Sequence, residues 1–287
     1  MKPLSGILDG TDPIIDRHLL MPSPDSGRKR SYRHKGAASN IENNREFDAE
    51  KMLIELIAQI KGNLKKCSTS TENWREILLP SLNPSNESDE VVLERKIAKA
   101  LLEKFAQQDS PWWNQMPIAS GLFSSTADHR RAIDLVHRRD ADGKHYDFVE
   151  LKIGSDTPLF ALTEILRYGL VYLVLREDRT WLHEETRARP IFDAEKIGLR
   201  VLAPQDYYNN DRENYGLNLS WIEDKINHAL PTVISELNLS RPLAMDISCH
   251  YHDLLNKEQL KKLLDKINPA DPLLLLDVDD WKQAYSS

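Results

Sequence analysis

Cysteine, glycine and long apolar runs are all scarce in this chain, and each scarcity excludes a class of protein. The two cysteines, Cys67 and Cys249, are too few for a disulfide framework and lack zinc or redox spacing, so reducing conditions suit the chain. None of the 11 glycines belongs to a Gly-rich loop that could cradle phosphate, which argues against an ATP-driven motor within this chain.

Apolar runs are also short. The longest, at 170–175 and 273–276, fall far below the ~20 residues that a membrane-spanning helix needs. The N-terminus has one positive charge but no following apolar stretch of signal-peptide length. We therefore expect no membrane span, no membrane partner and a cytoplasmic protein.

The charge balance is acidic, with a formal net charge of −7, and 40% of residues are apolar. Non-specific binding of nucleic acid requires clustered Lys and Arg, so any contact with DNA must be local. One predicted hairpin has such a cluster, made of Arg130, Arg131, Arg138, Arg139 and Lys144. These side chains either contact phosphate or protect the edge of a sheet.

Composition and periodicity divide the chain into four parts. Residues 1–45 are predicted to form a flexible leader, whose basic stretch at 28–35 is a solvated charge run. Residues 46–86 form a helical N-terminal segment and linker, with one helix from Phe47 and a short second helix at 71–79. Residues 87–240 form the core, and residues 241–287 form a C-terminal appendage.

The core pattern predicts a helix, three strands, a helix and a strand, in that order. The first helix runs from its cap at Ser88 to about Gln107, and a loop at Trp112 and Trp113 follows it. Strands are expected near 118–124, 131–138, 146–153 and 196–203, and the second helix at 159–167, extending to 175. A helix at 221–237, a strand at 243–248 and a helix at 257–267 complete the chain.

Charged residues interrupt two of these apolar strands. Alternation of side chains along 131–138 puts Asp134 on one face together with Ala132 and Val136. Ile133 and Leu135 point to the other face. The same alternation along 146–153 puts Glu150 and Lys152 together on one face. Each strand therefore interrupts an otherwise apolar pattern with charged residues.

The turn between the strands decides whether the two carboxylates meet. If 141–143 form a three-residue loop with Gly143 in the left-handed conformation, Asp134 faces Glu150 and their Cβ atoms lie about 4.5–5.5 Å apart. A two-residue turn at 142–143 would put the carboxylates on opposite faces. A metal site requires the first register.

Two carboxylates this close repel each other unless a cation lies between them. Mg²⁺ prefers oxygen ligands and commonly binds one or two carboxylates together with substrate phosphate. Such an ion can polarise a phosphoryl oxygen and lower the pKa of an attacking water. The ammonium group of Lys152 would orient that water or stabilise charge on the phosphate.

This arrangement resembles the PD-(D/E)XK nuclease superfamily, with Asp134 as the first acid and Glu150-Leu151-Lys152 as the E-x-K element. The resemblance covers residues 88–203. It implies an α/β protein with a restriction-endonuclease-like αβββαβ core, in which helices flank a mixed sheet, here with N-terminal and C-terminal helical additions. It also implies an acid on the first helix, which falls on Glu94, with Glu90 as the alternative.

Two motif positions depart from the superfamily pattern. Some branches have a Gln-x-x-x-Tyr element on the helix after the E-x-K strand, and this chain has Glu164 and Tyr168 there, with Glu in place of Gln. The proline before the first acid is replaced by Ile133. The resemblance still implies that Glu164 and Tyr168 line the site.

The resemblance implies a metal-dependent nuclease that hydrolyses DNA phosphodiester bonds. Asp134, Glu150 and Glu94 would bind Mg²⁺, with Mn²⁺ as an alternative ion, and Lys152 would activate water. DNA is the expected partner, and the terminal helices are candidates for a homodimer contact or for binding another protein.

Two alternatives stay open from the sequence. A nuclease-like fold can lose its chemistry and bind DNA or a protein partner instead, and a Glu150 locked in a salt bridge would favour this silent module. The charges can also form a plain cross-strand salt bridge, in which Lys152 neutralises Asp134 or Glu150.

Overall fold

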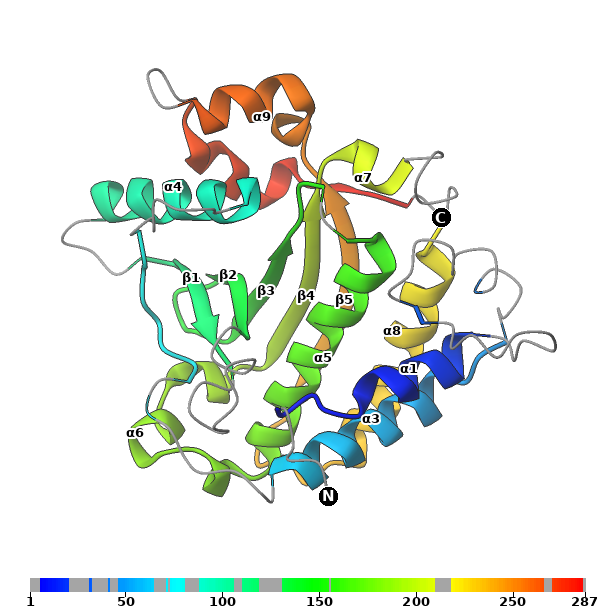
Figure 1. The fold of residues 1–287 in the computed structure, drawn as a ribbon. Coiled ribbons are helices and arrows are strands. Elements are labelled where there is room, and N and C mark those ends of the chain that lie inside the picture. Colours follow the sequence, from blue (N-terminus) through cyan, green and yellow to red (C-terminus); the bar gives the residue numbers. More distant parts are fainter. Residues whose placement is uncertain are drawn as a thin grey trace.

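The computed structural model describes residues 6–20, 31–32, 41, 46–64, 71, 73–80, 88–105, 110–118, 131–154, 156–209, 218–265 and 270–285. In these residues a mixed sheet of six strands is flanked by helices (Figure 1). The predicted α/β class, the mixed sheet and the N-terminal helices are therefore confirmed.

The strands lie in the sheet in their chain order, β1 to β6. Neighbours β1, β2 and β3 are antiparallel, β3, β4 and β5 are parallel, and β6 is antiparallel to β5. The strands are β1 Trp112–Pro117, β2 Ala132–Arg138, β3 His145–Leu151, β4 Lys196–Ala203, β5 Ala244–Tyr251 and β6 Lys282–Gln283.

The β2–β3 hairpin has the register that the three-residue loop predicts. Leu135 pairs with Val149 and Val136 with Phe148, so one further step places Asp134 opposite Glu150. Gly143 has φ 64°, a left-handed conformation that glycine adopts without steric cost. Of the two turns that the sequence allows, the structure therefore has the three-residue loop, which puts both carboxylates on one face.

Helix α4, Asp89–Lys104, begins after its cap Ser88, whose hydroxyl accepts from the Val91 amide. Helix α5, Pro158–Glu177, begins after Thr157 and crosses one face of the sheet (Figure 1). The length and hydropathy of α5 would suit a membrane span, but 89% of the window concerned is buried inside the protein. A core helix has the same composition.

The leader expected at 1–45 contains a folded part. Helix α1, Thr11–Leu19, packs on α3, Ala49–Leu64, and Ile15 and Leu19 are fully buried. Apolar residues at helical spacing within 11–19 produce this packing, so the prediction of flexibility is wrong for this segment. The basic residues at 28–30 and 33–35 lie outside the described residues.

The second short helix expected at 71–79 is also absent from the described part of that segment, residues 71 and 73–79. The chain there turns and then runs extended. Trp74 is fully buried against aromatic rings of β3 and α5, and its amide donates to the Pro117 carbonyl at 2.6 Å. Packing of one large aromatic side chain therefore overrides local helical spacing.

The first strand of the sheet begins earlier than expected. Trp112 and Trp113 belong to β1 and not to a loop, and the two indoles pack on opposite faces of the sheet. The strand expected near 118–124 falls almost entirely on residues 119–130, which lie outside the described residues.

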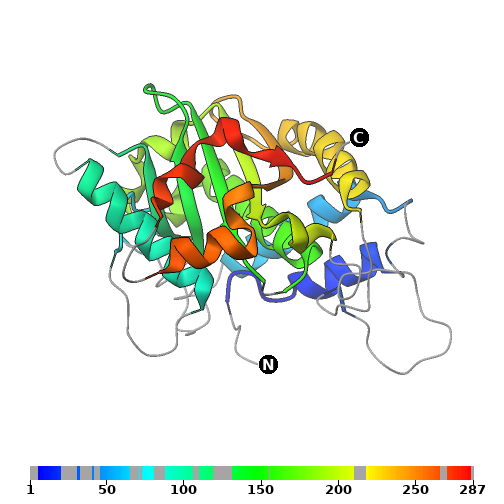
Figure 2. The ribbon, with the colours of Figure 1, turned by 90° about the horizontal axis from the view of Figure 1, so that it is seen from above.

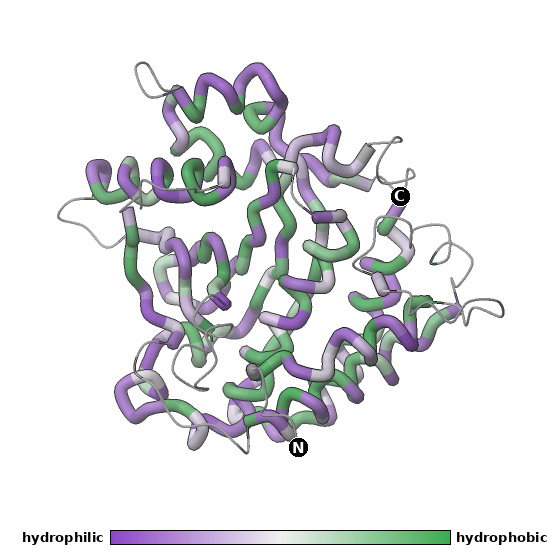
Figure 3. Tube along the Cα trace, viewed as in Figure 1, coloured by the Kyte–Doolittle hydropathy of each residue, from purple (hydrophilic) through white to green (hydrophobic). Residues whose placement is uncertain are grey.

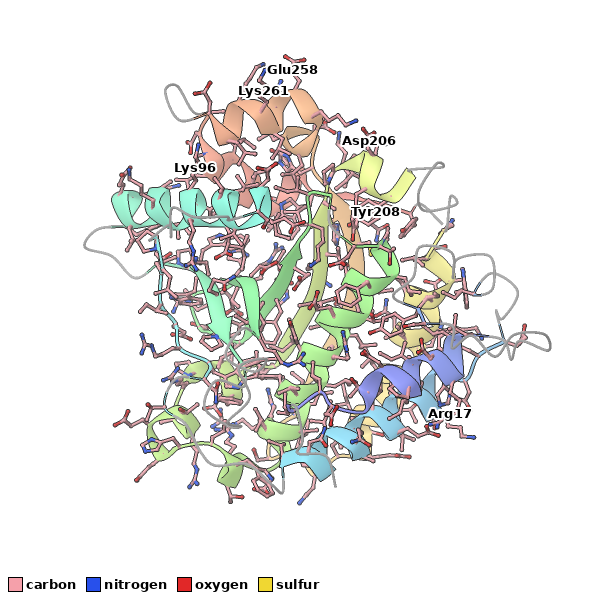
Figure 4. All side chains as sticks on the ribbon, viewed as in Figure 1. Arg17, Lys96, Asp206, Tyr208, Glu258 and Lys261 are labelled. Carbon is pink, nitrogen blue, oxygen red and sulfur yellow. The ribbon has the colours of Figure 1, made fainter. Side chains whose placement is uncertain are left out.

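Residues 241–287 are joined to the sheet and to α4. Strand β5 pairs with β4 along its whole length, and Met245 and Ile247 are buried in the main core. Lys96 of α4 donates to the Leu263 carbonyl at the end of α9, Lys257–Leu264, at 2.8 Å (Figure 4). Figure 2 also places α9 beside α4. A boundary at residue 240 therefore divides two neighbouring strands of one sheet.

Apolar residues form two clusters, one on each face of the sheet. The larger lies among α1, α3, α5, α8 (Ser220–Ser235) and the sheet, and the smaller lies between the sheet and α4, α9 and η6 (Pro272–Leu276). Along most elements the Cα trace alternates between apolar and polar residues (Figure 3). The remaining helices are η3 Arg179–Trp181, α6 Glu184–Arg187, η4 Pro190–Asp193, α7 Gln205–Asn209, α8 Ser220–Ser235, η5 Asp253–Leu255, η6 Pro272–Leu276 and η7 Val278–Asp280.

Candidate active site

The predicted site residues come from four elements that meet near the carboxyl end of β3. Asp134 lies near the start of β2, Glu150 is the penultimate residue of β3, and Lys152 follows that strand. Glu94 comes from α4 and Glu164 from α5. The structure therefore brings together residues that are up to 70 positions apart in the chain.

Lys152 is the positive centre of the group. Its Nζ lies 2.7 Å from Glu150 Oε1 and 3.2 Å from Glu164 Oε2. Burial alone would lower the pKa of Lys152, but the carboxylates of Glu150, Glu164 and Asp134 raise it well above its ordinary value. The surrounding carboxylates therefore favour the charged form of Lys152.

Glu164 links Lys152 to Tyr168. The Tyr168 hydroxyl donates to Glu164 Oε1 at 3.1 Å, while Glu164 Oε2 faces Lys152. Burial raises the pKa of Tyr168, so its hydroxyl keeps its proton. Glu164 is thus a second negative partner for the lysine, in addition to Glu150.

Glu150 is buried with half of its carboxylate unsatisfied. Oε1 contacts Lys152, whereas Oε2 has no hydrogen-bond partner in the structure. Burial, followed by the negative charges of Asp134 and Glu164, raises the pKa of Glu150. An unpartnered buried oxygen is costly unless a proton or cation meets it.

Asp134 is half-buried and is held by the strand that faces it. Its Oδ2 accepts from the Leu151 amide at 2.9 Å, and Oδ1 lies 3.5 Å from Gln115 Nε2. Burial is the main cause that raises the pKa of Asp134 to about 6, while Lys152 acts in the opposite direction.

Glu94 is held by two amide side chains of β1. Asn114 Nδ2 donates to its Oε1 at 2.5 Å, and Gln115 Nε2 donates to its Oε2 at 2.7 Å. Burial and the nearby negative charge of Asp134 raise the pKa of Glu94 to about 8. Glu90, the alternative acid, instead accepts from the Ile153 amide at 2.9 Å and holds the chain after β3.

Asn114 and Gln115 were missed from the sequence. Gln115 has φ 49°, which is rare for a residue other than glycine, and its amide bridges Glu94 and Asp134. The one available signal is a pair of amides at neighbouring positions of a strand otherwise made of apolar residues. Their partner lies 20 residues away on a helix, so local pattern does not identify it.

Whether these residues suit a metal ion can be tested on their own contacts. In the part of the chain that the structure describes, no group of three His, Cys, Asp or Glu side chains could hold a metal. Asp134 and Glu150 nonetheless face each other, both with raised pKa values, and Glu150 Oε2 lacks a partner. This donor set fits an ion that binds two carboxylates and completes its shell with water.

The basic residues expected near this site lie mainly at the other end of the hairpin. Arg139 lies 3.7 Å from Asp147, and Lys144 lies 3.1 Å from Glu195, both next to the turn. Arg131 immediately precedes β2, three positions before Asp134, and Arg130 is outside the described residues. A phosphate contact by Arg131 stays a prediction.

Comparisons of the chain with family models, with curated proteins and with solved structures found no match.

Proposed function

We propose that this protein is a metal-dependent nuclease that hydrolyses DNA phosphodiester bonds, and that residues 88–203 form a restriction-endonuclease-like core. The order α4, β1, β2, β3, α5, β4 supports the fold part of the proposal. The observation that carries the chemical part is the juxtaposition of Asp134 and Glu150 across the β2–β3 pair, with Lys152 beside Glu150.

Asp134 and Glu150 would bind Mg²⁺ or Mn²⁺ directly, and Glu94, whose two oxygens accept from Asn114 and Gln115, would complete the site without a direct bond to the ion. The bound ion would polarise a phosphoryl oxygen and lower the pKa of a water molecule. Asp134 and Glu150 supply the facing oxygens, and Glu94 acts through water or through the Gln115 amide that joins it to Asp134. Mutual repulsion of the three acids favours a cation at this place.

Lys152 would orient the attacking water and stabilise negative charge that develops on the phosphate. The raised pKa of Lys152 keeps its ammonium group charged, which suits electrostatic stabilisation. Glu164 and Tyr168 position Lys152 through the chain of contacts from the Tyr168 hydroxyl to Nζ.

A second candidate function is a catalytically silent module that binds DNA or a protein. The contact of Glu150 Oε1 with Lys152, at 2.7 Å, favours this alternative because it occupies one ligand oxygen and the catalytic cation together. The free Glu150 Oε2 favours the enzyme. A homodimer or a protein partner at the terminal helices is compatible with both functions.

Cleavage of circular and linear DNA, single- and double-stranded, tests the proposal, with magnesium, manganese or EDTA present. Lys152→Met is compared with Lys144→Met, which removes a lysine paired with Glu195 at the far end of the hairpin. The enzyme predicts metal-dependent cutting by the native protein and by Lys144→Met, reduced at least about a hundredfold in Lys152→Met. DNA binding without cutting in any metal would support the silent module instead.

A further inference from the structure

The sheet face beneath α4 is apolar at one end and polar at the other. Near the carboxyl end of β3, Leu135, Val149 and Leu202 pack in the smaller apolar cluster. Toward the opposite end, alternate positions of the same face are polar or charged. These residues are His137 of β2, His145 and Asp147 of β3, Lys196 and Arg200 of β4, and Asp246, Ser248 and His250 of β5.

This polar end lines a pocket of about 410 Å³. Its walls include Arg139, Lys196, Arg200, Ser248 and Trp281. The volume lies within the ~300–1,000 Å³ that small-molecule sites occupy. Asp147 and Glu150 project from opposite faces of β3, so the pocket is separate from the candidate active site.

The pocket's charges are organised around two aspartates. Asp147, 3% exposed, lies 3.4 Å from Arg200 Nε and 3.7 Å from Arg139 Nε. Arg200 also forms an ion pair with Asp246, and Lys196 Nζ lies 3.4 Å from the same residue. Three cations therefore meet two acids here, which leaves one positive charge unbalanced.

Gly198 makes the close approach of Asp147 and Arg200 possible. A Cβ atom at this position would lie 2.1 Å from Asp147 Oδ1 and 2.3 Å from an Arg200 guanidinium nitrogen. Real Cβ atoms do not come so near, so any other residue would displace the pair. The backbone is thus fitted to hold Arg200 on the pocket wall.

Two of the cations are only loosely held. The contacts of Arg139 and Lys196 with the aspartates, 3.7 and 3.4 Å, exceed the ~2.7–2.9 Å of a charge-assisted hydrogen bond. Their side chains are 31% and 46% exposed, so they can turn toward an anion that enters from water. Trp281 is fixed because its Nε1 donates to the Leu275 carbonyl at 2.9 Å, and its indole gives the pocket a flat wall.

We propose that this pocket binds a phosphate-bearing ligand of mononucleotide size. Arg139, Lys196 and Arg200 would bind the phosphate, because guanidinium and ammonium groups are the usual partners of phosphate oxygens. The planar ring of the ligand would lie against Trp281, as bases do on aromatic side chains.

Calorimetric titration of the full chain in EDTA tests the proposal, with adenosine 5′-monophosphate, adenosine and inorganic phosphate as probes. Lys196→Met and Arg139→Gln remove one contact each. Lys144→Met is the matched control, because Lys144 is similarly exposed, is also paired with one acid and does not line the pocket. Asp134→Asn tests whether the nucleotide binds at the candidate active site instead.

We expect the nucleotide to bind, adenosine and phosphate each to bind at least about tenfold more weakly, and Lys196→Met and Arg139→Gln to weaken nucleotide binding about tenfold. Lys144→Met and Asp134→Asn should bind like the native protein. The proposal is overturned if the nucleotide does not bind at millimolar concentration, if adenosine binds equally well, if the two pocket variants bind like the native protein, or if Asp134→Asn abolishes binding.

Discussion

Replacement of Glu94 with glutamine should change how stability depends on pH. Burial and Asp134 raise the folded-state pKa of Glu94 from 4.5 to about 8. Between these two values the folded chain holds a proton that the unfolded chain has lost, so the free energy of unfolding falls as pH rises. One such proton corresponds to at most about 1.4 kcal/mol per pH unit.

Glu94 loses its proton around pH 8, and because burial also raises the pKa values of Glu150 and Glu223, its share is measured as the difference between the native protein and Glu94→Gln from pH 7 to pH 8. Below pH 6.5 the effect is masked, because burial lowers the pKa of His137 to about 3 and that of His250 to about 4. Unfolding then takes up protons, and stability falls as pH decreases. Above pH 7 these histidines are mostly neutral in both states. Over the interval from pH 7 to pH 8, a folded-state pKa of about 8 for Glu94 lowers the free energy of unfolding by roughly 1 kcal/mol.

Urea denaturation in EDTA at pH 7.0, 7.5 and 8.0 measures this difference. From pH 7 to pH 8, the free energy of unfolding of Glu94→Gln should fall by about 1 kcal/mol less than that of the native protein. This corresponds to a difference of a few tenths molar in the shift of the urea midpoint. Glu103→Gln is the control, because Glu103 lies on the same helix with a side chain 70% exposed. Equal pH slopes for the native protein and Glu94→Gln would refute the reasoning that Glu94 is buried beside Asp134.

Four further predictions concern stability. Magnesium at pH 8 should raise the thermal midpoint of the native protein but not of Asp134→Asn, because an ion bound only by the folded state stabilises it; equal shifts in a thermal scan would contradict a site at Asp134. Lys152→Met should lower the free energy of unfolding by about 3–5 kcal/mol in urea, because it leaves Glu150 and Glu164 buried without their cation, and a loss below 1 kcal/mol would contradict this. Ile15→Ala should cost about 2–4 kcal/mol because Ile15 is fully buried, whereas an unchanged urea midpoint would restore the flexible leader. Gly198→Ala should cost about 1–3 kcal/mol because the new Cβ meets Asp147, and an unchanged midpoint would show that the pair shifts freely.

The two strands that carry Asp134 and Glu150 were predictable because their determinants are local. Strand periodicity assigns each side chain to a face, and Gly143 limits the turn to a two-residue or a three-residue loop, of which the structure has the latter. The same reasoning gave the bounds of β4 without error. Local rules therefore limit the strand pair to two registers, and the observed one makes the two carboxylates face each other.

Features that depend on distant packing were not predictable. The segment containing Ile15 has a leader-like composition, yet it is ordered by contacts with α3. The helix predicted at 71–79 does not form at residues 73–79, where Trp74 packs against Phe148 and Tyr172. The amide clamp of Gln115 on Glu94 joins a strand to a helix and has no signature within either element.

The central claim is that Asp134 and Glu150 form a site that cuts phosphodiester bonds. The most direct test is the single-turnover rate of DNA cleavage in magnesium by the native protein, by Asp134→Asn and by Asp193→Asn, which removes a carboxylate on a surface 3₁₀ turn. The account predicts that Asp134→Asn, folded as judged by circular dichroism, cuts at least about a hundredfold more slowly while Asp193→Asn keeps the native rate. Equal cleavage by the native protein and Asp134→Asn, or no cleavage by the native protein, would contradict it.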